Sequence, residues 1–135
     1  MPLAIAYGLT LVIFAVIDTL WLGAMGERLY RPLIGGVLAE RFRAAPAIVF
    51  YVVYAAGLAL FAVRPGLGEG WRTALVWGGL FGFFAYATYD LTNYATLRTW
   101  SLTLTIVDMA WGVVVSAASA SLATLAASKV IRLVG

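Results

Sequence analysis

The stretch Thr88-Tyr-Asp-Leu-Thr-Asn-Tyr-Ala-Thr-Leu-Arg-Thr-Trp100 decides how this chain is organised, because it places polar groups at the end of a long apolar run. It contains an acid, an amide and a cation, namely Asp90, Asn93 and Arg98, besides several hydroxyl groups. An unpaired polar group costs roughly several kcal/mol when it is placed in hydrocarbon. We therefore expect these groups to have partners elsewhere in the chain.

The composition is that of a membrane protein. Of the 135 residues, 64% are hydrophobic and 11% are charged, with a mean hydropathy of +0.98. Soluble domains have roughly 45–50% apolar and about 25% charged residues, and a soluble core of this size could not bury so much apolar surface. The length allows one domain, residues 1–135, and the expected fold class is an all-α, polytopic membrane protein.

Four segments have the length and apolar content of a membrane-spanning helix, which predicts a four-transmembrane-helix bundle. The predicted spans cover residues 3–24, 47–63, 71–97 and 102–126. The stretch Arg64-Pro-Gly-Leu-Gly-Glu-Gly70 between the second and third spans has the composition of a turn.

The longest connection, between the first two spans, has an amphipathic pattern. Pro32 should end the first helix or begin another. Apolar residues then recur at helical spacing opposite charged ones: Leu33, Ile34, Val37, Leu38 and Phe42 against Glu40, Arg41 and Arg43. This pattern predicts a short interfacial helix lying on the membrane, with an ordinary solvated loop as the alternative.

Three acids should meet in one half of the bundle. Asp18 lies late in the first span and Asp90 late in the third, which runs in the same direction. Asp108 lies early in the fourth span, which runs the opposite way. At 1.5 Å per residue each acid lies roughly 9–12 Å inside its helix end. Because three close carboxylates cannot all ionise cheaply, at least one should be protonated or paired.

Other residues are candidates for the same polar site because of their helical spacing from the acids. Asn93 and Tyr94 follow Asp90 at i+3 and i+4, and Arg98 lies eight residues on, on nearly the same face. Trp21 and Trp111 stand at i+3 from Asp18 and Asp108. The alternatives are a hydrogen-bond cluster that only fixes packing, and tryptophans that only anchor helices at the interface. The echo Asp18-Thr-Leu-Trp21 and Asp108-Met-Ala-Trp111 is too short to establish an internal duplication.

The absent residue types exclude several chemistries. The chain has no cysteine and no histidine, so thiolate ligands, an ordinary haem ligand and a histidine base are excluded. Three carboxylates could in principle bind magnesium, but there is no cluster of the D-D-x-x-D kind. We therefore expect neither a metal nor a cofactor. The net charge of +3 comes from a few scattered residues, which suits anionic lipid head groups and disfavours nucleic acid.

Two stretches of small residues are candidate packing faces. Gly78 and Gly82 form a small-xxx-small pattern, and Ser116-Ala-Ala-Ser-Ala-Ser121 is built of small side chains. Either could serve within the chain, or could bind a second copy or another membrane protein. Arg28 and Arg31 flank the end of the first span, while its beginning has no basic side chain. This asymmetry favours termini outside and an aspartate cluster near the cytoplasmic face.

Three motifs together resemble a known family. They are Asp18-Thr-Leu-Trp-Leu-Gly23, Tyr89-Asp-Leu-Thr-Asn-Tyr-Ala-Thr-Leu-Arg98 and Val107-Asp-Met-Ala-Trp-Gly112. They resemble an uncharacterised bacterial family of small four-helix inner-membrane proteins. In that family proline often follows the tryptophan, whereas here Ser101 follows Trp100. The resemblance implies a four-span topology in the bacterial inner membrane and assigns no reaction. Family members are often encoded near fatty-acid-modifying genes, an association with lipids.

Three functions fit these observations. The first is binding of, or action on, a membrane lipid or isoprenoid. The aspartates with Asn93 and Arg98 would then hold the head group, and aromatic residues of the third span would hold the tail: Phe81, Phe83, Phe84 and Tyr86. In a catalytic version an aspartate would act as general acid or base. The second is a structural subunit whose polar cluster serves packing. The third is a small proton-coupled transporter, which fits poorly because Asp18 lies near the far end of its helix.

Overall fold

The computed structural model describes residues 2–38 and 43–134, and all regular elements in these ranges are helical, so the all-α prediction is confirmed. In chain order the elements are α1 (Pro2–Met25), the π-helical η1 (Gly26–Tyr30), α2 (Arg31–Ile34), α3 (Ala44–Leu58), the π-helical η2 (Ala59–Val63), α4 (Arg64–Glu69), α5 (Trp71–Thr96) and α6 (Leu102–Val134).

Within residues 2–38 and 43–134, three continuous helical stretches are long and apolar enough to cross a membrane. They are Pro2–Ile34, Ala44–Glu69 and Leu102–Val134. The helix α5 is also 26 residues long, but its second half contains polar residues of the stretch that begins at Thr88, and these lower its apolar content.

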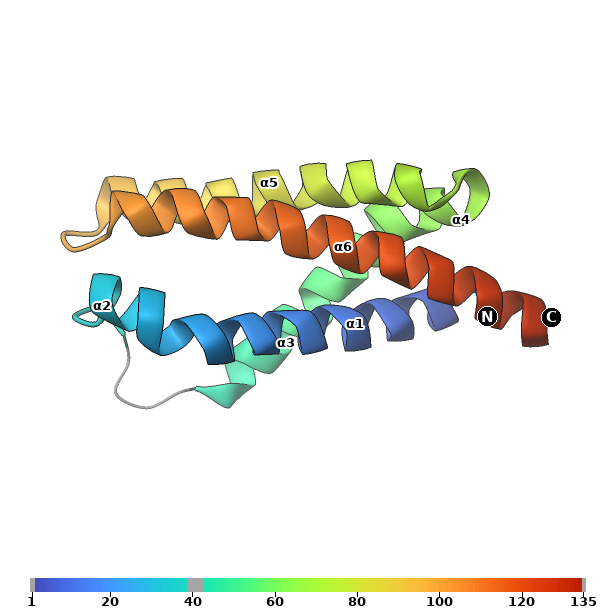
Figure 1. The fold of residues 1–135 in the computed structure, drawn as a ribbon, viewed down its shortest axis with the longest axis horizontal. Helices are drawn as coiled ribbons and strands as arrows, with labels where there is room; N and C mark the ends of the chain where they lie inside the picture. Colours follow the sequence, from blue (N-terminus) through green and yellow to red (C-terminus); the bar gives the residue numbers. More distant parts are fainter. Residues whose placement is uncertain (1, 39–42, 135) are drawn as a thin grey trace.

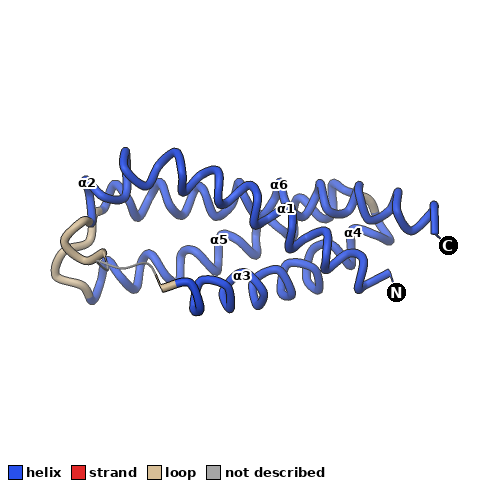
Figure 2. Tube along the Cα trace, turned by 90° about the horizontal axis from the view of Figure 1, so that it is seen from below, coloured by secondary structure: helices blue, strands red, loops and turns tan. Residues whose placement is uncertain are grey.

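The long helices lie roughly along one axis (Figures 1 and 2). α5 and α6 run antiparallel and side by side, and α1 packs against α6 and α3. α3 crosses behind α1 at an angle, and the N and C termini lie at the same end of the molecule. The hairpin between α5 and α6 lies at the other end, beside α2.

Each π-helical segment immediately precedes an Arg-Pro pair, Arg31-Pro32 or Arg64-Pro65. In both places the arginine N–H donates to the carbonyl five residues back, at Gly26 or Ala59. Proline has no N–H and its ring clashes with the carbonyl four residues back. A wider π turn relieves that clash without ending the helix.

The prediction of a turn over residues 64–70 is therefore wrong for most of that stretch. Residues 64–69 form α4, because the π turn over Ala59–Val63 accommodates Pro65 and the helix continues through it. Only Gly70, with φ of 110°, makes the turn into α5. The helices extend beyond the predicted spans. The first helix continues to Ile34, and α6 continues to Val134.

The predicted interfacial helix is not found as a separate element in the described part of the connection. Leu33 and Ile34 belong to α2, which continues the first helix, and Gly35 to Val37 form a turn. Glu40, Arg41 and Phe42 lie outside the described residues.

The two faces of small residues pack on each other within the chain. A side chain at Gly82 would meet the carbonyl of Gly112 and the hydroxyl of Ser116, and one at Gly78 would meet Ala120 at 2.7 Å. α5 and α6 therefore approach as closely as backbone allows. The two stretches that were candidates for binding a partner are buried against each other within the chain. Binding of a second copy or of another membrane protein stays a prediction.

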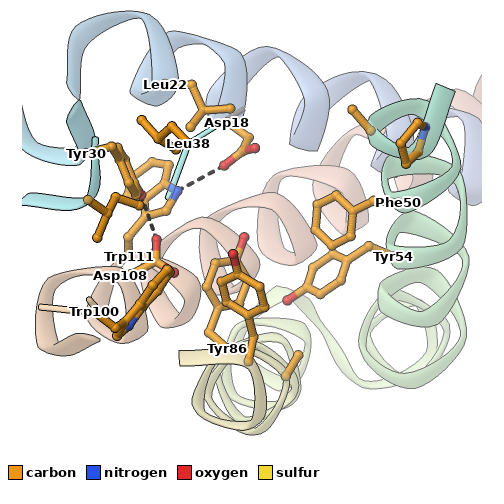
Figure 3. Close-up of a pocket in the computed structure, with 15 residues that line it drawn as sticks. Asp18, Leu22, Tyr30, Leu38, Phe50, Tyr54, Tyr86, Trp100, Asp108 and Trp111 are labelled. Atoms are coloured by element: carbon orange, nitrogen blue, oxygen red, sulfur yellow. Dashed lines mark hydrogen bonds between the residues drawn. The ribbon is translucent and has the colours of Figure 1, made fainter. Parts of the chain in front are cut away.

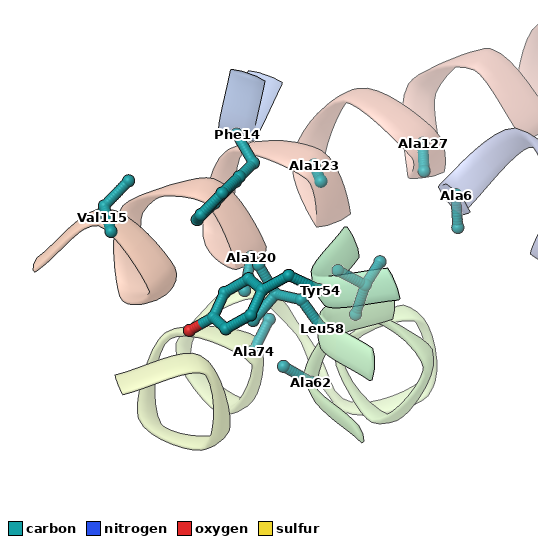
Figure 4. Packing of buried hydrophobic residues seen from close by; sticks show 11 residues of the cluster. Ala6, Phe14, Tyr54, Leu58, Ala62, Ala74, Val115, Ala120, Ala123 and Ala127 are labelled. Carbon is teal, nitrogen blue, oxygen red and sulfur yellow. The ribbon is translucent and has the colours of Figure 1, made fainter. Parts of the chain in front are cut away.

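The apolar core is built from small side chains around a few large ones (Figure 4). Phe14, Leu58 and Val115 are fully buried, and alanines of four helices fill the spaces between them. Large apolar side chains also cover the outside, including Leu20 at 69%, Phe84 at 64% and Ile106 at 62% exposure. An exposed apolar surface of this kind suits hydrocarbon rather than water.

We predict that Gly82→Ala destabilises the protein and that Gly79→Ala does not. A methyl at Gly82 forces α5 and α6 apart, at a cost of about 1–3 kcal/mol in the free energy of unfolding. At Gly79 the same methyl meets only Ala117 at 3.6 Å and Val113 at 3.7 Å, an ordinary contact. Thermal unfolding in detergent micelles measures both, and equal midpoints for the two variants would contradict this packing.

Candidate functional site

A cavity of about 650 Å³ lies near the end of the bundle that carries α2 (Figure 3). Its walls come from α1, η1, α2 and the turn after it, α3, α5 and α6. Most of the wall is apolar or aromatic. The lining residues are Asp18, Leu22, Tyr30, Ile34, Leu38, Pro46, Ala47, Phe50, Tyr54, Ala85, Tyr86, Tyr89, Trp100, Asp108 and Trp111.

Asp18 on α1 is tied to two other helices. Its Oδ1 accepts a hydrogen bond of 3.0 Å from Nε1 of Trp111 on α6. Its Oδ2 accepts one of 2.8 Å from the hydroxyl of Tyr51 on α3. The side chain is only 7% exposed. Both oxygens therefore act as acceptors from neutral aromatic donors.

Asp108 on α6 has a matching but longer connection to α1. Its Oδ1 accepts a hydrogen bond of 2.6 Å from the hydroxyl of Tyr30, which itself accepts one of 2.8 Å from Nε1 of Trp21. The rings of Trp21 and Trp111 stack with centroids 4.2 Å apart and planes within 8°.

The two Asp-x-x-Trp sequences thus form a reciprocal pair. In antiparallel helices, position i of one motif faces position i+3 of the other. The tryptophan of each motif therefore reaches toward the aspartate of the other, directly at Asp18 and through Tyr30 at Asp108. The geometry gives the sequence echo a physical role without requiring a duplication.

Asp90 on α5 lies beside Asp108 and is fully buried, at 0% exposure. It does not line the cavity. Neither of its carboxyl oxygens has a hydrogen-bond partner among the described residues. An unpaired charge there would cost several kcal/mol, so a proton or a nearby cation has to compensate it.

None of Asn93, Tyr94 and Arg98 lines the cavity or has a hydrogen bond to an aspartate among those found in the described residues. α5 ends at Thr96, so the helical-face argument that placed Arg98 beside Asp90 does not apply, and Arg98 is exposed. Tyr94 is 46% exposed and Asn93 is half-buried, and neither lines the cavity. Of the aromatic residues expected around a tail, Tyr86 lines the cavity, whereas Phe83 and Phe84 are exposed.

Sequence reasoning missed the tyrosines that complete the site. Tyr30 and Tyr51 donate to the two aspartates, and Tyr54 shares a 2.6 Å hydrogen bond with Ser116 of α6. Tyr51 and Tyr54 were detectable as the main polar groups of an otherwise apolar helix. No comparable signal existed for Tyr30, which lies in a polar connection.

The described wall of the cavity carries negative but no positive side chains. No lysine or arginine is among its lining residues, and the ion pair found in residues 2–38 and 43–134 joins Arg31 to Glu27, both well exposed. Within the same ranges no group of three or more acids is arranged to hold a metal ion. The arrangement is an apolar, aromatic cavity with two carboxylates and several hydroxyls on its wall.

We predict that Trp111→Phe lowers stability by about 1–3 kcal/mol, because it leaves Oδ1 of the buried Asp18 without its donor while retaining an aromatic ring. The matched control is Trp77→Phe, since Trp77 is 51% exposed on the outside of α5. Unfolding midpoints in the same detergent provide the comparison. Similar losses at both positions would show that ring volume, not the hydrogen bond, matters.

Comparison with known proteins agrees with these features. Neither the search of curated proteins nor the search of solved structures gives a match. A family model described as "Predicted membrane protein (DUF2177)" matches residues 3–125, nearly the whole chain, and includes the three aspartates. The chain therefore belongs to this family of membrane proteins of unknown function.

Proposed function

We propose that this membrane protein binds an amphiphile, a membrane lipid or an isoprenoid, in the cavity beside Asp18 and Asp108. The observation that carries the proposal is the cavity itself, which combines a polar patch with a mostly apolar wall. Its volume of about 650 Å³ lies in the range of roughly 300–1,000 Å³ typical of small-molecule sites. A head group would contact the carboxylates and hydroxyls, and a chain would lie along Ile34, Leu22 and Phe50.

Access from the bilayer supports this occupant. Several lining side chains are exposed, among them Leu22 at 45%, Leu38 at 38%, Phe50 at 44% and Tyr89 at 57%. The cavity therefore has an apolar rim. An amphiphile within the membrane could pass this rim without leaving a hydrocarbon environment.

The proposed topology has four membrane spans. α5 supports the fourth, because it lies beside α6 and exposes large apolar side chains such as Val76, Leu80 and Phe84. Its polar residues Asp90 and Thr88 need not face lipid unpaired, since Asp90 is buried and the hydroxyl of Thr88 donates to the carbonyl of Phe84. Acidic side chains of membrane-spanning helices face the interior of the bundle in this way.

We place the protein in the bacterial inner membrane with the cavity toward the cytoplasmic side. Arg28 and Arg31 lie at the cavity end of the first helix, and no basic side chain flanks its beginning. The first helix usually dominates orientation. Both termini would then lie outside.

A structural function is the second candidate, and the bonds of Asp18 favour it. This side chain joins α1 to α3 and α6 through Tyr51 and Trp111, so it holds three helices together whatever the cavity contains. In a purely structural protein, however, filling the cavity would not remove a ligand.

The two functions are separated by filling the cavity. Ala85→Phe and Ala47→Phe project a ring into it from different helices, whereas Ala110→Phe adds the same ring on the exposed face of α6. We expect the wild type and Ala110→Phe to retain a defined lipid-like molecule after purification in mild detergent, and both cavity variants to lose it. Native mass spectrometry with lipid extraction measures this. Equal retention by all four proteins, at equal unfolding midpoints, would overturn the binding proposal.

A further inference from the structure

We infer that the cavity recognises a positively charged ammonium head group on a membrane amphiphile. The inference deepens the amphiphile-binding function proposed above and rests on it. It follows from two separate features of the wall, its charge and its aromatic side chains.

The first feature is the sign of the charge. Asp18 and Asp108 both line the cavity, and the hydrogen bonds found for them among the described residues come from neutral tyrosine and tryptophan donors. The described lining contains no lysine or arginine that would neutralise them. A phosphate or carboxylate placed here would face two acids at short range, whereas a cation would find complementary charge in a poorly solvated site.

The second feature is the arrangement of the aromatic rings. Tyr89 and Trp100 meet nearly at right angles, with an interplanar angle of 84° and centroids 5.9 Å apart. Tyr54 and Tyr86 form a second such corner, at 79° and 6.0 Å. All four residues line the cavity. Each pair is an edge-on-face contact, and aromatic side chains in a cavity wall attract an ammonium group through the electron-rich faces of their rings.

The test compares amphiphiles that share a decyl chain and differ in head group. Decyltrimethylammonium, decyl sulfate and decyl maltoside are titrated against the full chain in a neutral detergent, and bound adducts are counted by native mass spectrometry. We expect one ammonium amphiphile per chain, bound roughly tenfold or more tightly than the other two. A fourth arm, didecanoyl phosphatidylethanolamine, separates an ammonium on a phospholipid from a simple alkylammonium, and binding of either one supports the inference.

Variants connect the binding to the wall. Asp108→Asn should weaken ammonium binding by roughly tenfold, while Glu69→Gln, an equal charge change at an exposed position on α4, should not. Tyr89→Leu should weaken it by about two- to fivefold, because it removes a ring face. Tyr89 is 57% exposed, so this variant should fold even where an aspartate variant does not.

The outcomes separate the two levels of the argument. Equal affinity for the three head groups would overturn the ammonium inference and leave the amphiphile site standing. Preference for decyl sulfate would overturn it in the same way. If none of the four amphiphiles binds, both the inference and the proposed function fail.

Discussion

The structure depends on the antiparallel crossing of α1 and α6 at their Asp-x-x-Trp sequences. Two acids in an apolar bundle have to be satisfied, and here each obtains a donor from the opposite helix. The stacked indoles of Trp21 and Trp111 fix the relative height of the helices, since sliding by one turn would break the stack and both acceptor sites. The Tyr51 hydroxyl of α3 also donates a hydrogen bond to Asp18, which holds the first half of α3 against α1.

This arrangement of hydrogen bonds leaves two negatively charged side chains, Asp18 and Asp108, on the wall of a cavity. Among the described residues, Asp18 and Asp108 accept hydrogen bonds from neutral donors and form no ion pair. Ala47 of α3 and Ala85 of α5 contribute small side chains to the wall of this cavity. The same acids can therefore hold helices together and face a cavity, and the structural and binding functions need not exclude each other.

The helical class and the meeting of Asp18 with Asp108 could be predicted from the sequence. The helical class follows from the apolar composition. The meeting of the two acids follows from the alternating direction of successive helices, which sets the position of each residue along the bundle axis. The prediction that Arg98 lies on the same helix face as Asp90 assumed that the helix continued to residue 98, whereas α5 ends at Thr96. The donors Tyr30 and Tyr51 depend on the rotation of each helix about its own axis, which a chain so uniformly apolar does not specify.

The π turn over Gly26–Tyr30 also has a consequence for how this chain can be aligned with others. A π turn corresponds to one extra residue inserted into an α-helix, and one residue rotates everything after it by about 100°. The direction of the Tyr30 hydroxyl and the facing of Ile34 are therefore set partly by how many residues precede them, not only by which residues they are. A homologous chain that lacked one residue of this turn would keep the same sequence motifs. Its residues equivalent to Tyr30 and Ile34 would point in different directions, so the wall of the cavity would differ.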